Sequence, residues 1–384
     1  MAPRSLRQPL GLKIVSNGFL AFWCLVAAFP ILWITVMSFK TPIDAFDSNP
    51  FRVIFGPHTR DNIAGLSLID IVLGLALVGF LARQAVIWLP RKVADYDHWD
   101  RRTLAWLVGG GAYAIVSLVL LLVVLPAVVG FLNPLLGPLG SNIIGLTTEH
   151  YEAVWVDRGF TRNFMNSMVV TTGVVTISLT VGTLAGYGLA RSDSLIAFWL
   201  LVVALVFRAL PHSVLVSGYL PYFISSSEWL SAIFGDAAPT LYGKPWAIIA
   251  VLVAINQPFT IWMLRSFFQN IPAELDEAAR VDGCSHFEAF RRVIVPVMWP
   301  GVITTGLFSF LLAYNDFLVT SLLLDAQNMT MVPAIANMFN RETTASDEVQ
   351  AIAAAVSITA PLFLLVLIFQ RQIVSGLTAG AVKG

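Results

Sequence analysis

Long apolar stretches recur along the chain, and the shorter segments between them hold most of the charged side chains. Each stretch has roughly 20 residues, which is enough for a helix to cross the hydrocarbon core of a bilayer. None alternates apolar and polar residues with the period of two that a membrane barrel strand shows, so we expect helices. The eight stretches are residues 14–39, 66–89, 104–129, 163–190, 195–211, 245–264, 300–324 and 351–369.

Basic residues between the stretches predict how the chain is oriented in the membrane. With a cytoplasmic N-terminus, alternation of the eight spans places fourteen Lys and Arg residues in cytoplasmic segments and seven outside. This distribution obeys the positive-inside rule, and both termini are therefore predicted to be cytoplasmic. The first stretch is longer than the apolar core of a signal peptide, so we expect it to be retained as a helix.

The composition agrees with a membrane protein and excludes other classes. Apolar residues make up 57% of the 384 residues and charged residues only 12%, whereas an ordinary soluble domain has about 25% charged residues. The 23 basic and 23 acidic side chains leave no positive charge that would indicate nucleic-acid binding. The two cysteines are too few for a disulfide framework. The predicted fold class is an all-α polytopic membrane protein.

The longest cytoplasmic segment between predicted spans, residues 265–299, contains the signals of two short helices. Pro272 is suited to a first helical position, and Gly283 to the left-handed conformation that ends a helix. Ser285 and Glu288 have the spacing of a capping box, which starts a second helix. The segment is therefore predicted to form two helices separated by a turn at Gly283.

The second of these helices is expected to have one apolar face. Phe287, Phe290 and Ile294 recur at spacings of three and four residues, and Pro296 is expected to end the helix. Two helices of this size bury little surface by themselves, so we expect them to bind a partner. The alternative is an ordinary amphipathic cytoplasmic loop, and the spacing alone leaves both interpretations open.

A motif in this segment resembles a known signature. Glu277, Ala278 and Ala279 are followed after three residues by Gly283 and later by Pro296, and this pattern resembles the EAA loop of ABC-transporter importer permeases. Two valines stand at the consensus Ile and Leu positions, which are conservative departures. The resemblance implies that a cytoplasmic ATPase subunit binds the loop. The residues expected to couple the two subunits are Glu277, Ala278, Ala279, Asp282, Gly283, Phe287, Phe290 and Pro296.

Five further segments extend the resemblance, namely Ser38–Thr41, Asn163–Ser167, Gly186–Arg191, Leu264–Phe268 and Gly376–Gly384. They look like carbohydrate-uptake permeases of the maltose-permease G type. The family resemblance implies a type I ABC importer transmembrane domain in the bacterial inner membrane. In this family the C-terminal tail reaches toward the ATPase, so the tail residues expected to contact it are Gly376, Leu377, Thr378, Gly380 and Lys383.

The resemblance also implies which partners and cofactors are needed. ATP and magnesium are expected on a separate ATP-binding cassette ATPase dimer and no cofactor on this chain. The remaining partners implied are a second permease subunit, maltose-permease F-like, and a periplasmic or lipid-anchored sugar-binding protein. The chain has no P-loop motif, since its one Gly-Lys pair, Gly243-Lys244, is followed by Pro245. We therefore expect a transport subunit rather than an enzyme, carrying an oligosaccharide, glycoside or polyol.

The predicted domain organisation departs from the usual six-span pattern of the family at one place. Residues 60–135 form an inserted transmembrane hairpin, which is either a structural helix pair or a regulatory docking site. Such lengthening resembles the α-glucoside-type branch. The other predicted regions are the N-terminus with the first span, 1–40; the core permease domain, 155–370, with the coupling loop 265–299; and the cytoplasmic tail, 371–384.

Polar residues within the seventh predicted span are candidates for the substrate path. Tyr314, Asn315 and Asp316 resemble an aromatic, Asn, acid pattern at this point of related sugar permeases. Either they line the path of the sugar, or they clamp helices together, with Arg208 as a candidate partner. The alternative functions are an ion-gradient-driven secondary transporter, although no internal symmetry is evident in the sequence, and a structural membrane protein without transport.

Overall fold

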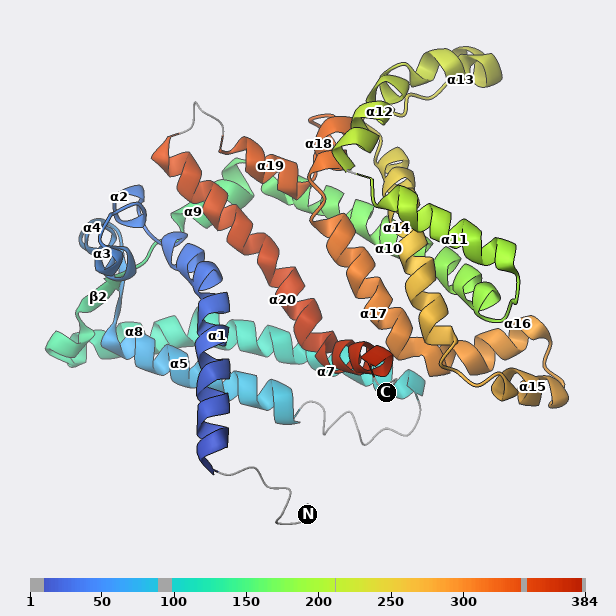
Figure 1. The fold of residues 1–384 in the computed structure, drawn as a ribbon. Coiled ribbons are helices and arrows are strands. Elements are labelled where there is room, and N and C mark those ends of the chain that lie inside the picture. The colour runs from blue at the N-terminus through green and yellow to red at the C-terminus, as the bar shows by residue number, and fades with distance from the viewer. Residues whose placement is uncertain (1–9, 89–98, 211, 340–343, 382–384) are drawn as a thin grey trace. The chain divides into compact units, whose positions relative to one another are not determined.

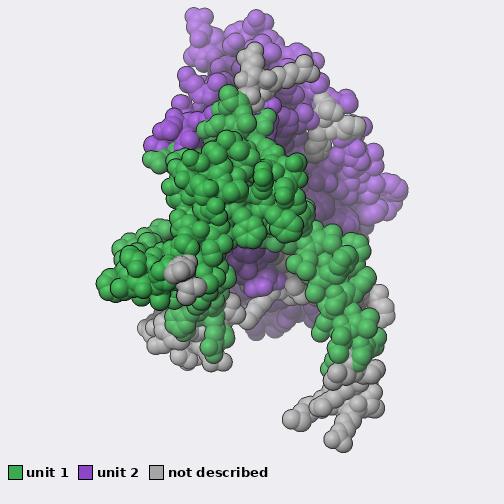
Figure 2. All heavy atoms as spheres, turned by 90° about the vertical axis from the view of Figure 1, so that its left-hand side faces the viewer, with its two compact units in different colours: residues 1–152, 344–353 green, residues 153–343, 354–384 purple. Residues whose placement is uncertain are grey.

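The structure is a computed structural model that describes residues 10–88, 99–210, 212–339 and 344–381. The chain divides into two compact units (Figure 2). Unit 1 comprises residues 1–152 and 344–353, and unit 2 comprises residues 153–343 and 354–384.

Unit 1 starts with a long apolar helix, which is followed by short helices, a helical hairpin and a two-stranded sheet (Figure 1). In chain order its elements are α1 (Leu10–Met37), α2 (Pro42–Ala45), α3 (Pro50–Phe55), α4 (Pro57–Asn62), β1 (Gly65–Ser67), α5 (Leu68–Arg83), the π-helix η2 (Gln84–Trp88), α7 (Trp99–Val119), the π-helix η3 (Leu120–Val124), α8 (Leu125–Leu132), the 3-10 helices η4 (Asn133–Leu135) and η5 (Gly137–Gly140), β2 (Asn142–Gly145) and α9 (Glu149–Glu152).

A small sheet closes the base of the helical hairpin. Strands β1 and β2 are antiparallel, with Gly65 opposite Gly145 and Leu66 opposite Ile144. Helix α5 then begins with a capping box, in which the Ser67 side chain accepts from the backbone N–H of Asp70. The hairpin predicted for 60–135 is thus bounded by paired strands, and its charged connection, residues 89–98, lies outside the described residues.

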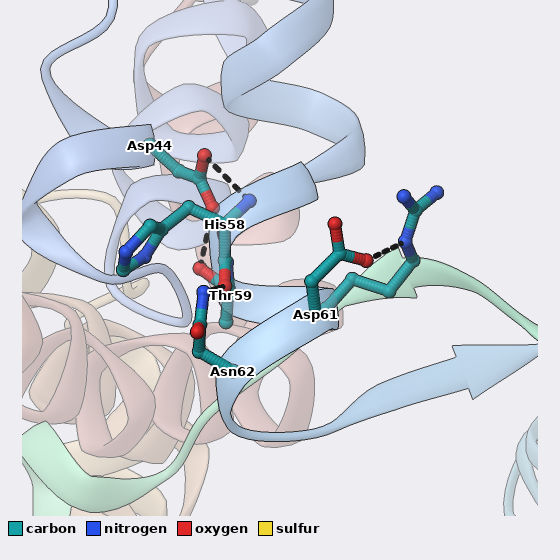
Figure 3. A network of polar contacts seen from close by, with 6 residues as sticks. Asp44, His58, Thr59, Asp61 and Asn62 are labelled. Atoms are coloured by element: carbon teal, nitrogen blue, oxygen red, sulfur yellow. Dashed lines mark hydrogen bonds and ion pairs between the residues drawn. The ribbon is translucent and has the colours of Figure 1, made fainter.

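Polar side chains tie the segment after α1 to the rest of unit 1. The Asp44 carboxylate accepts from the Thr59 backbone N–H at 2.6 Å, the Thr59 hydroxyl at 2.7 Å and the His58 backbone N–H at 3.2 Å. Figure 3 shows Asp44 directed at these groups, which lie in the first turn of α4, where backbone N–H groups have no helical partner. The ammonium group of Lys40 donates to the Gly145 carbonyl oxygen, and the Lys40 carbonyl oxygen lies 2.8 Å from His150 Nε2.

Burial changes the acid–base properties of this cluster. Lys40 as a whole residue is only 2% exposed, and desolvation lowers the pKa of its ammonium group to about 8, although the nearby Asp44 carboxylate opposes the shift. Burial also lowers the pKa of the His150 imidazole. The cluster holds the end of α1 against the strand β2, so the base of the hairpin and the end of the first span form one structure.

Unit 2 contains most of the remaining long helices. In chain order its elements are the π-helix η6 (Ala153–Asp157), α10 (Phe160–Ala190), α11 (Leu195–Arg208), α12 (His212–Ile224), α13 (Ser226–Phe234), the 3-10 helix η7 (Gly235–Ala237), α14 (Pro245–Phe268), α15 (Glu274–Val281), α16 (His286–Ala289), the π-helix η8 (Phe290–Ile294), α17 (Val295–Tyr314), α18 (Leu318–Leu323), α19 (Met331–Asn337) and, from residue 354 onward, α20 (Ala345–Ala381).

Three helices, α10, α14 and α17, pack against one another at the centre of unit 2. Glycines allow α10 and α14 to approach closely. A Cβ atom on Gly186 would lie 3.0 Å from the backbone nitrogen of Arg265, and one on Gly182 would lie 2.6 Å from Thr260 Cγ2. The spacing of these two glycines is the small-xxx-small pattern of membrane helix contacts. The apolar core around α14 includes Val170, Val174, Ile248, Leu252, Val319 and Leu323.

Six helices among the described residues are long and apolar enough to cross a membrane, namely 11–37, 108–135, 160–190, 245–268, 286–314 and 345–370. They correspond to six of the eight predicted spans. The other two predictions, 66–89 and 195–211, contain the 16-residue α5 and the 14-residue α11. The seventh span has different bounds from the prediction of 300–324, because α17 ends at Tyr314 and α18 is a separate short helix.

Candidate functional site

The loop between α14 and α17 contains the motif residues, and its turn agrees with the sequence prediction. Helix α15 ends at Val281, and Gly283 has a φ of +92°, the left-handed conformation that favours glycine. The capping box is also present, since the Ser285 hydroxyl accepts from Glu288 N–H at 3.3 Å and the Glu288 carboxylate accepts from Ser285 N–H at 3.1 Å. The predicted division of the loop into two helices is confirmed.

The two prolines of the loop have other roles than those predicted. Helix α15 begins at Glu274, so Pro272 precedes the helix instead of occupying its first position. Pro296 does not end the second helix. The chain continues from α16 through the π-helix η8 into α17, and Val295 N–H bonds to the Phe290 carbonyl, five residues back. This wider turn accommodates a residue that lacks an N–H, so proline interrupts the hydrogen bonding without breaking the helix.

An acidic side chain anchors α15 to the end of α10. The Asp276 carboxylate accepts from the Tyr187 hydroxyl at 2.6 Å and from Arg191 Nε at 2.8 Å. The side chains of Asp276 and Arg191 are only 14% and 22% exposed, and charge-assisted bonds of this kind are the strong ones. The ring of Tyr187 packs against Phe268 and Phe290, with centroids 5.6 Å and 4.8 Å away.

The predicted coupling residues divide into a buried and an exposed set. Ala279 and Phe290 are 6% and 8% exposed and belong to the packed side of the loop. Phe287 is 63% exposed, and Val281, for which the sequence predicted no role, is 87% exposed. The remaining predicted coupling residues, which are also exposed, are Glu277, Ala278, Asp282, Gly283 and Pro296. The loop thus exposes both apolar and acidic side chains.

The anchoring group was not predicted from the sequence. By sequence position Asp276 is only one of three acids that favour the N-terminal end of a helix, and Tyr187 and Arg191 lie in the segment Gly186–Arg191, which carries the family resemblance. The three residues converge in space although 85 residues separate Arg191 from Asp276. A possible signal was present, because a Tyr and an Arg four residues apart lie on one helical face at a predicted membrane boundary.

The proposed substrate-path residues lie at the junction of α17 and α18. Tyr314 is 1% exposed, stacks on Phe310 at 5.0 Å, and donates to the Ile358 carbonyl of α20 at 2.8 Å. Asn315 bonds to the Leu311 carbonyl, and the Asp316 carboxylate accepts from Thr320 N–H at 2.9 Å. Tyr314 therefore joins two helices, and the other two side chains finish α17 and start α18.

Two further predictions concern Arg208 and the tail. The guanidinium of Arg208 lies over the Phe259 ring, with its Cζ atom 4.8 Å from the centroid. In the tail, α20 continues to Ala381 and includes Gly376, Leu377, Thr378 and Gly380, whereas Lys383 lies outside the described residues. Whether the tail contacts an ATPase stays a prediction.

The sequence is similar to membrane transport components. Residues 178–378 match the family described as binding-protein-dependent transport system inner membrane component. The trehalose transport system permease protein SugB of Mycobacterium tuberculosis is 34% identical over 241 residues, covering 62% of this chain and 83% of SugB. The alpha-glucoside transport system permease protein AglG of Rhizobium meliloti is 30% identical over 322 residues, covering 80% of this chain and 76% of AglG.

A solved structure shows the same fold. A chain from a bacterial ABC transporter involved in the import of the acidic polysaccharide alginate superposes with a TM-score of 0.56 and 15% identity. The match covers 97% of this chain and 98% of that chain. The hairpin of unit 1 is therefore included in the structural similarity.

Proposed function

The chain belongs to the binding-protein-dependent ABC permeases of the carbohydrate-uptake family, and from this membership we propose how it couples sugar transport to ATP hydrolysis. It is a multi-pass inner-membrane permease subunit of a sugar importer and has no ATPase activity of its own. The proposal concerns the topology, the partners and the coupling residues of this subunit.

In the proposed topology, eight spans cross the membrane and both termini are cytoplasmic. The fourteen-to-seven excess of basic residues in the cytoplasmic segments supports this arrangement. The hairpin of residues 60–135 is an insertion before the core domain 155–370, and the loop 265–299 lies in the cytoplasm. The paired strands β1 and β2 support the hairpin as a distinct inserted element.

The proposed mechanism is alternating access, driven by a separate ATPase dimer that binds ATP and magnesium. The loop helices α15 and α16 bind in a groove of the ATPase, and closure of the dimer moves them. The observation that carries the proposal is the exposure of Val281 and Phe287, at 87% and 63%, in a loop whose motif acid Glu277 is also exposed. Burial of each of these two apolar side chains against a partner would contribute about 1.5–3 kcal/mol.

The loop is closely connected to α14 and α17, so the three should move together. Helix α16 runs through η8 into α17 without a break, and only residues 269–273 separate α14 from α15. Phe290 and Ile294 belong to a buried apolar cluster with Leu264 and Phe268 of α14. A displacement of the loop would therefore be passed to α14 and α17 directly instead of being absorbed by flexible chain.

The remaining partners are a second permease subunit and a periplasmic or lipid-anchored sugar-binding protein. We propose an oligosaccharide, glycoside or polyol as the substrate, with α-glucosides the first class to test. The match to AglG covers 80% of this chain and therefore leaves out about a fifth of it. Even if the uncovered part lies entirely at the N-terminal end, the match includes part of residues 60–135. That extent supports a relationship to the α-glucoside branch through the hairpin as well as the core.

The proposal is tested with the complete complex in proteoliposomes. Addition of the binding protein with its sugar should raise ATP hydrolysis. Gly283→Val should abolish this stimulation, because valine at a φ of +92° costs about 1–3 kcal/mol and displaces the turn between α15 and α16.

The matched control is Gly235→Val. Gly235 also has a positive φ, +59°, and, as at Gly283, no atom lies within 4 Å of an added Cβ. The control also places a β-branched residue at a positive φ, but it lies before α14 in the chain and outside the loop, so stimulation should persist. Normal sugar-stimulated hydrolysis in Gly283→Val would contradict the coupling role of the loop.

A further inference from the structure

We propose that Asp276, Arg191 and Tyr187 form a latch that transmits the movement of α15 to α10, which makes Asp276 a positioning residue for coupling. The inference rests on the proposed function, because it assumes that the ATPase moves the loop. The loop is connected along the chain to α14 and α17, and the latch connects it to a third helix, α10.

The latch is needed because α10 has no short chain connection to the loop. Helix α14 is joined to α15 by five residues, 269–273, and α17 is continuous with α16. Helix α10, in contrast, ends 83 residues before α15 begins, at Ala190 and Glu274 respectively. It nevertheless packs along both α14 and α17 and forms the centre of unit 2 with them. Without side-chain contacts at its end, α10 would slip against helices that move with the loop.

The contacts at the end of α10 are suited to prevent such slippage. Both oxygens of Asp276 are used, one by the Tyr187 hydroxyl and the other by Arg191 Nε. Arg191 also donates from Nη1 to the Phe268 carbonyl at 3.5 Å, at the C-terminal end of α14, where a cation is favoured by the helix dipole. One guanidinium thus bridges α10, α14 and α15.

The aromatic packing around the latch fixes its position. The rings of Tyr187 and Phe290 lie 4.8 Å apart, and the Phe268 ring lies 6.4 Å from that of Phe290. These rings come from α10, from η8 and from α14. Since the polar latch and the aromatic cluster share Tyr187, α15 and η8 are held to the same face of α10.

An exposed ion pair outside the loop serves as a control. Arg60 Nε and the Asp61 carboxylate lie 2.8 Å apart in α4, and their side chains are 37% and 61% exposed. Exposed pairs of this kind contribute little to stability. Asp61→Asn removes the same charge as Asp276→Asn. The Arg60–Asp61 pair joins neighbouring residues of one helix, whereas the Asp276–Arg191 pair is more buried and joins α15 to the end of α10.

The experiment measures sugar-stimulated ATP hydrolysis and sugar uptake by the complete complex in proteoliposomes, with ATPase retention checked by co-purification. Asp276→Asn and Arg191→Gln should each lower the sugar stimulation about tenfold and reduce the sugar imported per ATP, with the ATPase still bound. The double variant should be no worse than either single variant, because both remove the same contact. Asp61→Asn should stay within about twofold of the unaltered complex.

Tyr187→Phe is a milder variant that tests the latch even if Asp276→Asn or Arg191→Gln prevents assembly of the complex. It keeps the ring in the aromatic cluster and removes only the 2.6 Å hydrogen bond, so we expect about a threefold loss of stimulation. The latch is overturned if Asp276→Asn behaves like Asp61→Asn, if the Asp276 and Arg191 losses multiply in the double variant, or if Tyr187→Phe changes nothing. Failure of the proposed function gives a different result, namely no sugar stimulation in the unaltered complex.

Discussion

Replacement of Gly186 by alanine is expected to force α10 and α14 apart. The added Cβ would lie 3.0 Å from both the Arg265 backbone nitrogen and Leu264 Cβ, and 3.3 Å from the Leu264 carbonyl carbon. These atoms belong to the α14 backbone or are fixed directly to it, so no side-chain rotation relieves the contact. The helices themselves must shift by a few tenths of an ångström.

The expected magnitude follows from two opposing effects. Overpacking of a close interface costs about 1–3 kcal/mol. Alanine in a helix is favoured over glycine by about 0.5–1 kcal/mol, which offsets part of this cost. Gly186→Ala should therefore destabilise unit 2 by up to about 2.5 kcal/mol. Gly188→Ala, two residues away in the same helix, meets no atom within 4 Å and should show only the favourable effect.

In the assay the purified complex is heated in detergent, and the height of its elution peak is measured afterwards. The midpoint is the temperature at which this height has fallen to half. A change of 1 kcal/mol shifts the midpoint by about 2–4 °C in a domain of this size. Gly186→Ala should lower the midpoint, and Gly188→Ala should leave it equal or raise it. The close packing of α10 on α14 would be refuted if both variants lowered it equally, or if Gly186→Ala raised it.

Two further predictions concern buried polar groups. Lys40 has a pKa of about 8 in the folded protein, against 10.5 for the free side chain, so between these pH values the unfolded chain binds more protons and stability rises with pH. The thermal midpoints of the unaltered protein and of Lys40→Met are compared at pH 7 and at pH 9.5. Between the two pH values the difference should shift in favour of the unaltered protein, and an unchanged difference would contradict this. Tyr314→Phe removes the bond to the Ile358 carbonyl and should cost about 1 kcal/mol without altering the sugar concentration that gives half-maximal stimulation; a large change in that concentration would instead place Tyr314 in the sugar path.

The features that the sequence predicted correctly are those determined within a few residues. The stop at Gly283 and the capping box of Ser285 and Glu288 depend on local backbone chemistry, and both are present. The EAA resemblance pointed to the correct family for the same reason, because its spacing is a local pattern. The eight apolar stretches were found by length and composition, and six of them are confirmed as helices able to span a membrane.

The features that the sequence did not predict depend on distant or unusual geometry. The pairing of Asp276 with Arg191 joins residues that are far apart in the chain, and the spacing of Tyr187 and Arg191 does not identify Asp276 as their partner. Pro296 was expected to end a helix, as proline usually does, but the π-helix η8 before it changes the hydrogen-bond pattern. Strands β1 and β2 have only three and four residues, which is too short for a recognisable alternation.

The most direct test of the central claim, that the α15–α16 loop binds a separate ATPase, is co-purification of the ATPase with charged variants of exposed positions. Val281→Asp puts a charge at a residue of α15 that is 87% exposed. The control is Ile233→Asp, which puts a charge at a residue of α13 that is 74% exposed. Helix α13 precedes α14 in the chain, whereas α15 follows α14 (Figure 1). Neither change disturbs a buried core. Val281→Asp should release the ATPase from the complex while Ile233→Asp retains it, and full ATPase retention with normal sugar-stimulated hydrolysis in Val281→Asp would contradict the claim.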